Sequence, residues 1–251
     1  MVSVADTLVL LAAGGVAGVV GTAGGITSLV SYPALLWVGI AAAPANVANI
    51  VALVTYLPGS ALASRPELKG KGRWLCRWAL LTALCGGAGA VALLLTPSKS
   101  FAMVVPFLVA AGSLALLAQP LLTSWKARRR RRGERFLLPC GLVPVSLYSG
   151  YFGAGSGVMT LALLLLTVEP DVVNANALKN VLVGVASAVS AIILVLFTHV
   201  DWGAVVPLGI GTFAGSTVGP LVARRVRGDI LRWAVGLVGL GLALRLWIGP
   251  S

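Results

Sequence analysis

Two glycine-rich stretches of this chain carry the residue types best suited to hold a small anion. The glycine spacing of the first stretch returns 132 residues later in the second. The corresponding positions are Gly18 and Gly150, Gly21 and Gly153, and Gly25 and Gly157. Glycines favour turns, and a helix that starts after a turn has backbone N–H groups without an intrahelical partner. Those groups and the helix dipole attract anions, so the stretches indicate an oxyanion site.

Hydroxyl side chains next to these glycines add hydrogen-bond donors. They are Thr22, Thr27, Ser28, Ser149, Ser156 and Thr160. The residues of the two stretches that we expect to bind the ligand are Gly21, Thr22, Gly24 and Gly25, and Gly153, Gly155, Ser156 and Gly157. In an alternative interpretation, the small residues only let helices approach closely, and the hydroxyls bond their own backbone. The repetition of the pattern favours binding.

Lys179 adds a charge within an apolar run, and a charge inside a membrane span is a candidate functional residue by default. Asn176 and Asn180 share a helical face with Lys179 because residues three and four apart are neighbours. At an offset of 131, Asn49 corresponds to Asn180, whereas Ala48 corresponds to Lys179. We therefore expect the three asparagines and the lysine to contribute to substrate binding.

Three roles remain open for Lys179 at this point. It could contact the anion, or its ammonium group could snorkel toward the membrane interface near Pro170. It could also form an ion pair with Glu169 or Asp171. A proton relay would need titratable groups deep in the membrane, and none is evident besides Lys179. The simpler expectation is transport driven by the anion gradient and the membrane potential, which supplies about 2.3 kcal/mol per charge and 100 mV.

The composition shows which class of protein contains these residues. The chain has 251 residues, of which 58% are hydrophobic and 10% are charged, and its mean hydropathy is +0.98. Globular proteins carry roughly 25% charged residues, so we expect an all-α polytopic membrane protein. The net charge of +12 is then explained by Lys and Arg that set the orientation in the membrane. Nucleic acid is not an expected partner.

An enzyme is not expected. Residues 153–157 form neither the G-x-S-x-G motif of serine hydrolases nor a nucleotide-binding loop. The single His and the three Cys residues lack the spacing of a metal site. We therefore predict no catalytic residues, no metal and no cofactor.

Eight apolar runs are expected to form the membrane-embedded helices. They cover residues 7–40, 46–64, 75–96, 101–125, 136–168, 174–198, 202–222 and 230–248. Most are close to the ~20 residues that cross a hydrocarbon core of about 30 Å. The first and fifth are too long, since one helix over residues 7–40 would measure about 50 Å. Each should break at its glycines into a hairpin that returns the chain to the side from which it came.

Basic residues predict the orientation of these helices. If the N-terminus lies outside and both long runs are hairpins, links 65–77, 126–135 and 224–232 all face the cytoplasm. These links hold 16 of the 19 Lys and Arg residues, as the positive-inside rule requires. The C-terminus is then outside as well. The two long runs enter the membrane from opposite sides, which predicts inverted repeats.

Each predicted repeat is a glycine-broken hairpin followed by three transmembrane helices. The repeats cover residues 1–125 and 136–251, and residues 126–135 form a basic cytoplasmic linker. The linker's run from Arg128 to Arg132 is expected to anchor the topology and to contact anionic lipids. Matched glycine-broken segments in two halves point to a transporter site at the repeat interface, near the membrane midplane.

Three segments of the chain have the features of a known family. They are the first glycine-rich stretch with Pro33, Leu35, Leu36 and Gly39 after it, SGYFGAGSG at residues 149–157, and NALKNV at residues 176–181. Together they resemble the TauE/SafE sulfite exporter family over about residues 8–248. The resemblance implies a transporter of small sulfur-containing anions, such as sulfite or organosulfonates, in the bacterial inner membrane. An anion channel on the same scaffold is the alternative.

Overall fold

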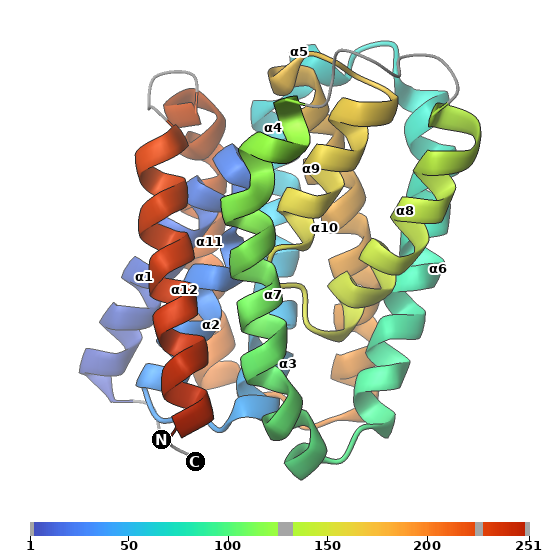
Figure 1. Cartoon of the computed structure of the whole chain (residues 1–251). Coiled ribbons are helices and arrows are strands. Elements are labelled where there is room, and N and C mark those ends of the chain that lie inside the picture. The colour runs from blue at the N-terminus through green and yellow to red at the C-terminus, as the bar shows by residue number, and fades with distance from the viewer. Residues whose placement is uncertain (1–2, 125–132, 224–227, 249–251) are drawn as a thin grey trace.

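The structure is a computed structural model that describes residues 3–124, 133–223 and 228–248. Within these ranges the chain forms a bundle of helices without β-strands (Figure 1). Five helical stretches in the described part are long and apolar enough to cross a membrane. They are Val4–Thr22, Ala42–Ala63, Gly72–Leu95, Ser98–Ala118 and Val172–Phe197. The prediction of an all-α membrane protein is confirmed.

The eight apolar runs are all helical. Before residue 125 the elements are α1 (Val4–Gly24), α2 (Thr27–Trp37), α3 (Ala42–Ala52), the 3-10 turn η1 (Leu53–Thr55), α4 (Tyr56–Ala63), α5 (Arg65–Leu68), α6 (Gly72–Leu95) and α7 (Ser98–Ser124). From residue 133 they are α8 (Gly133–Tyr151), α9 (Ser156–Thr167), α10 (Val172–Phe197), α11 (Trp202–Ala223) and α12 (Gly228–Ile248). α5 has no counterpart among the predicted helices. The helix predicted over residues 46–64 begins earlier, at Ala42.

Left-handed glycines break both long runs. Gly25 has a φ of 77° and closes the end of α1 by donating its N–H to Gly21 O. Between α8 and α9, Gly153 and Gly155 have φ angles of 81° and 79°. Residues with a Cβ disfavour this conformation. In Figure 1, α8 descends from the upper end and α9 returns to it, with the turn about halfway along the bundle. The predicted breaks are confirmed.

The helix ends gather at the two ends of the bundle. In Figure 1, α5, the start of α6 and the ends of α7 and α11 lie at the upper end. The first turn of α1 and the last turn of α12 both lie at the lower end, as two hairpins require. Residues 125–132 and 224–227 are outside the described ranges. The lipid contact predicted for Arg128 to Arg132 therefore lies outside the described residues.

Two helix pairs pack so closely that their backbones touch. α1 lies along α11, where a Cβ built on Gly14 would be 2.3 Å from Leu208 O. α8 lies along α6, where a Cβ built on Gly150 would be 1.9 Å from Gly86 O. Such close approaches require small residues. Glycines upstream of the breaks therefore serve helix packing.

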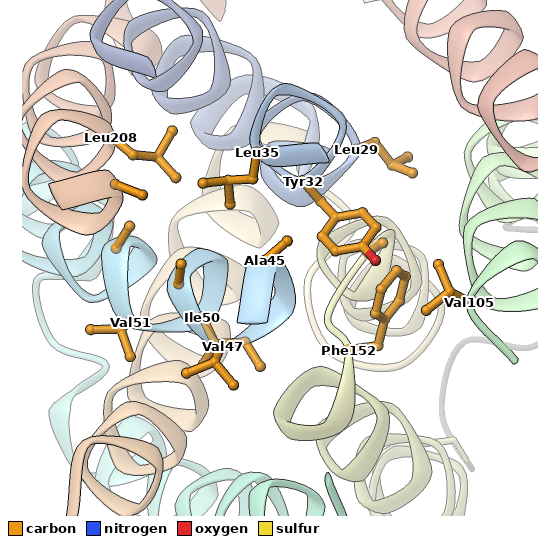
Figure 2. Packing of buried hydrophobic residues seen from close by; sticks show 14 of the residues in the cluster. Leu29, Tyr32, Leu35, Ala45, Val47, Ile50, Val51, Val105, Phe152 and Leu208 are labelled. Carbon is orange, nitrogen blue, oxygen red and sulfur yellow. The ribbon is translucent and has the colours of Figure 1, made fainter. Parts of the chain in front are cut away.

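The buried core joins the two broken runs. Figure 2 shows Tyr32 of α2 facing Phe152, which follows α8, and the ring centroids are 5.1 Å apart in an edge-to-face contact. Val105 of α7 lies beside Phe152, and Ala45 of α3 lies beside Tyr32. Aromatic pairs of this geometry stabilise beyond the area that they bury. The first long run is thus packed directly against the second.

Candidate functional site

The two glycine breaks meet each other. A Cβ built on Gly25 would lie 2.5 Å from Gly157 C, and a Cβ built on Gly157 would lie 2.5 Å from Gly25 O. Cβ atoms do not approach other atoms so closely, so neither position accepts a larger residue unless one run moves. Two residues that correspond at the offset of 132 are therefore in direct contact.

A small cavity lies beside this contact. Its volume is about 30 Å³, which is room for about two water molecules. Its glycines are Gly25, Gly153 and Gly157, and its polar side chains are Thr27, Ser28, Tyr56, Ser149, Ser156 and Ser187. Apolar residues from α3, η1, α10 and the turn after α8 complete the lining. Both broken runs thus contribute to one polar cavity inside an apolar bundle.

The first turns of α2 and α9 border the cavity. Thr27 and Ser28 begin α2, and Ser156 and Gly157 begin α9. N–H groups in a first helical turn have no intrahelical partner and carry the positive end of the helix dipole. The arrangement offers hydrogen-bond donors from two directions, which is chemistry that suits an anion.

The carbonyl of Gly21 is the centre of a hydrogen-bond cluster behind the cavity wall. It accepts from Lys179 Nζ at 2.9 Å and from Gly25 N at 2.7 Å, and the Tyr56 hydroxyl oxygen lies 3.4 Å from it. The C-terminus of a helix carries the negative end of its dipole and favours a cation. Lys179 is bound to this helix end and is not among the residues that line the cavity.

The surroundings of Lys179 exclude two of its three predicted roles. Its side chain is fully buried in α10, so the ammonium group does not snorkel to the interface. Glu169 pairs with Lys71, with Nζ and Oε2 2.7 Å apart. Asp171 caps α10 by accepting from the N–H of Asn174. Both carboxylates proposed as partners of Lys179 therefore have other roles.

Asn176 and Asn46 hold the C-termini of the helices that precede the breaks. Asn176 of α10 donates to Thr22 O of α1 at 2.5 Å, and Asn46 of α3 donates to Tyr151 O of α8 at 2.9 Å. The amide oxygen of each asparagine is buried without a hydrogen-bond partner. Each half of the chain thus donates one asparagine hydrogen bond to the broken run of the other half.

Asn49 and Asn180 have the opposite arrangement, in which the amide nitrogen is unpaired. Asn49 Oδ1 accepts from the Ser31 hydroxyl at 2.5 Å, and Asn180 Oδ1 accepts from the Tyr56 hydroxyl. Both Nδ2 atoms are buried without a partner. Residues three, four or seven apart share a helix face. The cavity-lining residues at these spacings are Leu53 and Tyr56 for Asn49, and Val183 and Ser187 for Asn180.

The residues predicted from sequence fall into three groups. Those that line the cavity are Gly25, Gly153, Ser156 and Gly157. Those in the hydrogen-bond clusters around it are Gly21, Thr22, Asn49, Asn176, Lys179 and Asn180. Gly24 and Gly155 are in neither group, since Gly155 packs on Gly112 of α7 and Gly24 lies near the side chain of Ile26.

The structure adds residues that the sequence does not single out. Asn46 precedes Asn49 by three positions, so the repeated asparagine was a usable signal for it. Tyr56 and Ser187 stand in ordinary apolar spans, and nothing in the sequence marks them. Their roles follow from contacts with residues more than a hundred positions away, such as that between Tyr56 and Asn180.

Comparison with known proteins decides the family. The sequence model described as sulfite exporter TauE/SafE matches residues 8–246. The chain belongs to the TauE/SafE family. A curated relative, the probable membrane transporter protein ORF9 of Sinorhizobium sp, is 28% identical over 175 residues, which are 69% of this chain and 66% of the relative. The match thus covers slightly less than two thirds of the relative, and no solved structure matches the chain.

TauE/SafE membership gives the class of protein to which the chain belongs. The family is described as one of exporters, the curated relative is named as a probable membrane transporter, and the five long apolar helices among the described residues fit a multi-pass membrane protein. The cavity between the two breaks is the candidate substrate site.

Proposed function

We propose that this protein transports small sulfur-containing anions, of the sulfite or organosulfonate type, and exports them from the cell. The observation that carries the proposal is the polar cavity at the contact of Gly25 and Gly157, where the starts of α2 and α9 converge. The substrate binds there, between the two glycine-rich hairpins and near the membrane midplane. The description of the family supports sulfite as the type of cargo.

The donors at this cavity suit an oxyanion. Ser28 and Ser149 in the lining supply hydroxyl groups. Asn49 and Asn180 are not lining residues, but each has a buried Nδ2 without a partner, and we propose that these groups reach the bound anion. A buried donor without a partner is unfavourable by about 1–3 kcal/mol, so a bound oxygen atom relieves that penalty. The three oxygens of a sulfite or sulfonate group can engage donors from several helices at once.

We further propose that residues 1–125 and 136–251 form two inverted repeats. The helix pairing supports this proposal, because exchanging α1 with α8 and α6 with α11 converts the α1–α11 pair into the α8–α6 pair. In Figure 1, α1 enters from the lower end and α8 from the upper end. Opposite entry of two equivalent hairpins is the arrangement of inverted-repeat transporters.

Individual contacts also support the repeat. Gly25 touches Gly157, as equivalent residues beside a two-fold axis would. Asn46 holds the end of α8, and Asn176 holds the end of α1. In the proposed orientation, both termini are outside the cytoplasm of a bacterial cell, and α5 lies on the cytoplasmic side with the basic linker 126–135.

The small size of the cavity favours a carrier over a channel. A space of about 30 Å³ is close to the size of two waters, and the Gly25–Gly157 contact closes the gap between the runs. A substrate larger than this space requires the two runs to separate. Such movement around a fixed site is alternating access, whereas a channel would need a continuous path.

Flux through proteoliposomes tests the proposal. Purified protein should take up sulfite or a sulfonate with saturation, and an internal pool of the same anion should accelerate uptake by counter-exchange. Sulfate, thiosulfate, sulfoacetate and taurine complete the panel, with phosphate and chloride as controls. Large single-channel currents without saturation would establish a channel. A preference for the controls would refute the sulfur-anion assignment.

A further inference from the structure

Lys179 places a basic side chain deep in the bundle, and it forms no ion pair with a carboxylate in the described part of the chain. The side chain is fully buried, and its Nζ donates to Gly21 O at 2.9 Å. Removing a charge from water is unfavourable unless an opposite charge and hydrogen bonds compensate. The carbonyl at the negative end of α1 compensates in part. A ligand that carries a full negative charge would complete the compensation.

The charged side chains on the helices that pack against α10 lie near helix ends. In the described part of these helices they are Asp6 of α1, Arg65 and Glu67 of α5, and Arg73 and Arg77 of α6. Asp6 belongs to the capping box of α1, and the three arginines are exposed. The side chains of Glu134 and Arg135 in α8 are outside the described part. Lys179 is thus the described cation nearest to the cavity along α10.

The ammonium group and the cavity share one structural element. The Gly21 carbonyl that binds Lys179 also accepts from Gly25 and lies 3.4 Å from the Tyr56 hydroxyl oxygen, and both of these residues line the cavity. One carbonyl oxygen therefore connects the Lys179 ammonium group to two residues of the cavity lining. Opposite charges attract more strongly inside a protein than in water because the dielectric constant is lower.

We infer that Lys179 is the single counter-charge of the substrate, so that this carrier selects sulfur oxyanions that bear one negative charge. This inference rests on the proposed function. A hydrogensulfite ion or a simple sulfonate together with Lys179 gives a site of zero net charge. A dianion such as sulfate leaves one uncompensated negative charge in an apolar bundle, which is unfavourable.

The same charge balance determines which step senses the membrane potential. A site loaded with a monoanion is neutral, so the change of the loaded carrier between its inward-facing and outward-facing forms moves no net charge. The empty site carries the positive charge of Lys179, and an inside-negative potential draws it inward. Export of the anion therefore gains its electrical driving force during the return of the empty carrier.

Two flux measurements on the intact protein in proteoliposomes test this inference. The first compares methanesulfonate, a permanent monoanion, with sulfate as competitors for methanesulfonate counter-exchange. Close charge pairs contribute at least about tenfold to affinity, so methanesulfonate should compete at least that much better than sulfate. The second imposes a potential with a potassium ionophore. The rate of exchange between equal methanesulfonate pools should not depend on the potential. Net efflux should accelerate when the compartment that holds the anion is made negative.

Variants assign these properties to Lys179. Lys179→Gln should weaken the competition by methanesulfonate at least about tenfold and should make exchange sensitive to the potential, because the loaded site is then negative. Lys179→Arg retains the charge and should keep both properties. Lys99→Gln removes a lysine at the start of α7, away from the cavity, and should behave as the wild type.

Each outcome decides the matter. Equal competition by sulfate, or wild-type exchange that follows the potential, would overturn the inference even if Lys179→Gln failed to fold. Unchanged affinity for methanesulfonate in a folded Lys179→Gln protein would overturn it as well. These results would leave sulfur-anion transport itself in place. Absence of flux for every sulfur anion would instead refute the proposed function, and the inference with it.

Discussion

At the residue scale, Gly25 and Gly157 require glycine for different reasons. Gly25 has a left-handed φ of 77°, whereas Gly157 is not among the glycines with a positive φ. What Gly157 lacks is space, because Gly25 O occupies the place of its Cβ. A substitution at Gly157 therefore tests the contact between the two runs without straining the backbone.

Gly157→Ala should reduce the maximal rate of counter-exchange roughly tenfold or more, since shifts of about 1 Å at a site have effects of that order. The new Cβ must push α9 away from Gly25. Rates per inserted protein in proteoliposomes provide the measurement. Gly241→Ala is the control, because a Cβ there meets nothing within 4 Å. A wild-type rate for Gly157→Ala would show that the contact is irrelevant to transport.

Asn49→Ala should raise the apparent substrate constant about tenfold to a hundredfold, because a hydrogen bond to a charged ligand contributes about 1.5–3 kcal/mol. Ser31 loses one acceptor but keeps its bond to Thr27 O at 3.1 Å, so the local structure should persist. The concentration dependence of uptake gives the constant. Asn174→Ala, at the start of α10, serves as the control. An unchanged constant would remove Asn49 from the site.

At the scale of the elements, backbone contacts between α1 and α11 determine how the first broken run is held. A Cβ built on Gly211 of α11 would lie 2.1 Å from Leu11 O. Backbone atoms cannot rotate away as a side chain does. The helices must therefore separate if this glycine is replaced, and the tip at Gly25 moves with α1.

Gly211→Ala should lower the thermal midpoint of the purified protein in detergent. Alanine favours a helix over glycine by about 1 kcal/mol, but overpacking disfavours the fold by about 1–3 kcal/mol, and contact with rigid backbone lies at the upper end of that range. Gly241→Ala obtains the helix gain without the clash and should unfold at the wild-type temperature or above it. Equal midpoints for the two variants would contradict the close packing.

The helices and their breaks were predictable because few alternatives exist. A run over residues 7–40 is too long for one crossing, and only its glycines offer a turn at low cost. The four residues of α5 (Arg65–Leu68) are too few and too polar to mark a helix. The sequence reveals where chains can approach closely, as at Gly14, but it does not name α11 as the partner.

The site was predictable in part for the same reason. Glycines at a constant offset indicated the breaks that line the cavity, and polar residues within an apolar run indicated Asn180 and Lys179. The place of Lys179 behind the wall could not be predicted, because it depends on the position of Gly21 O, 158 residues away. Tyr56 was missed because its hydroxyl acquires a role through Asn180 Oδ1, which is 124 residues away.

At the scale of the whole molecule, the charges and the number of crossings agree on one arrangement. The first turn of α1 and the last turn of α12 lie at one end of the bundle, and α5 lies at the other (Figure 1). The chain enters its first hairpin from the former end and its second from the latter. In the proposed inverted repeat, substrate meets equivalent surfaces from either side, which is what a symmetric carrier requires.

A reporter at the C-terminus should be active only outside the cytoplasm, because both broken runs return the chain to the side of entry. A reporter inserted after residue 69, in the basic link after α5 (Arg65–Leu68), should be active only inside. The positive-inside rule gives the sign of both expectations. If the C-terminal reporter were active inside and the inserted reporter outside, the orientation would be inverted. If both reporters were active inside, the hairpin topology would be rejected.

Protection of a cavity cysteine by substrate tests most directly whether the cavity between the two breaks is the substrate site. Cys76, Cys85 and Cys140 are free and would be replaced by serine before Ser187→Cys is introduced in the cavity lining. Increasing methanesulfonate should slow modification of this cysteine by a small thiol reagent, with the same concentration dependence as transport. Ser100→Cys, in the exposed first turn of α7, should react at a constant rate. Failure of Ser187→Cys to react without anion, or reaction that saturating anion leaves unchanged, would contradict the account.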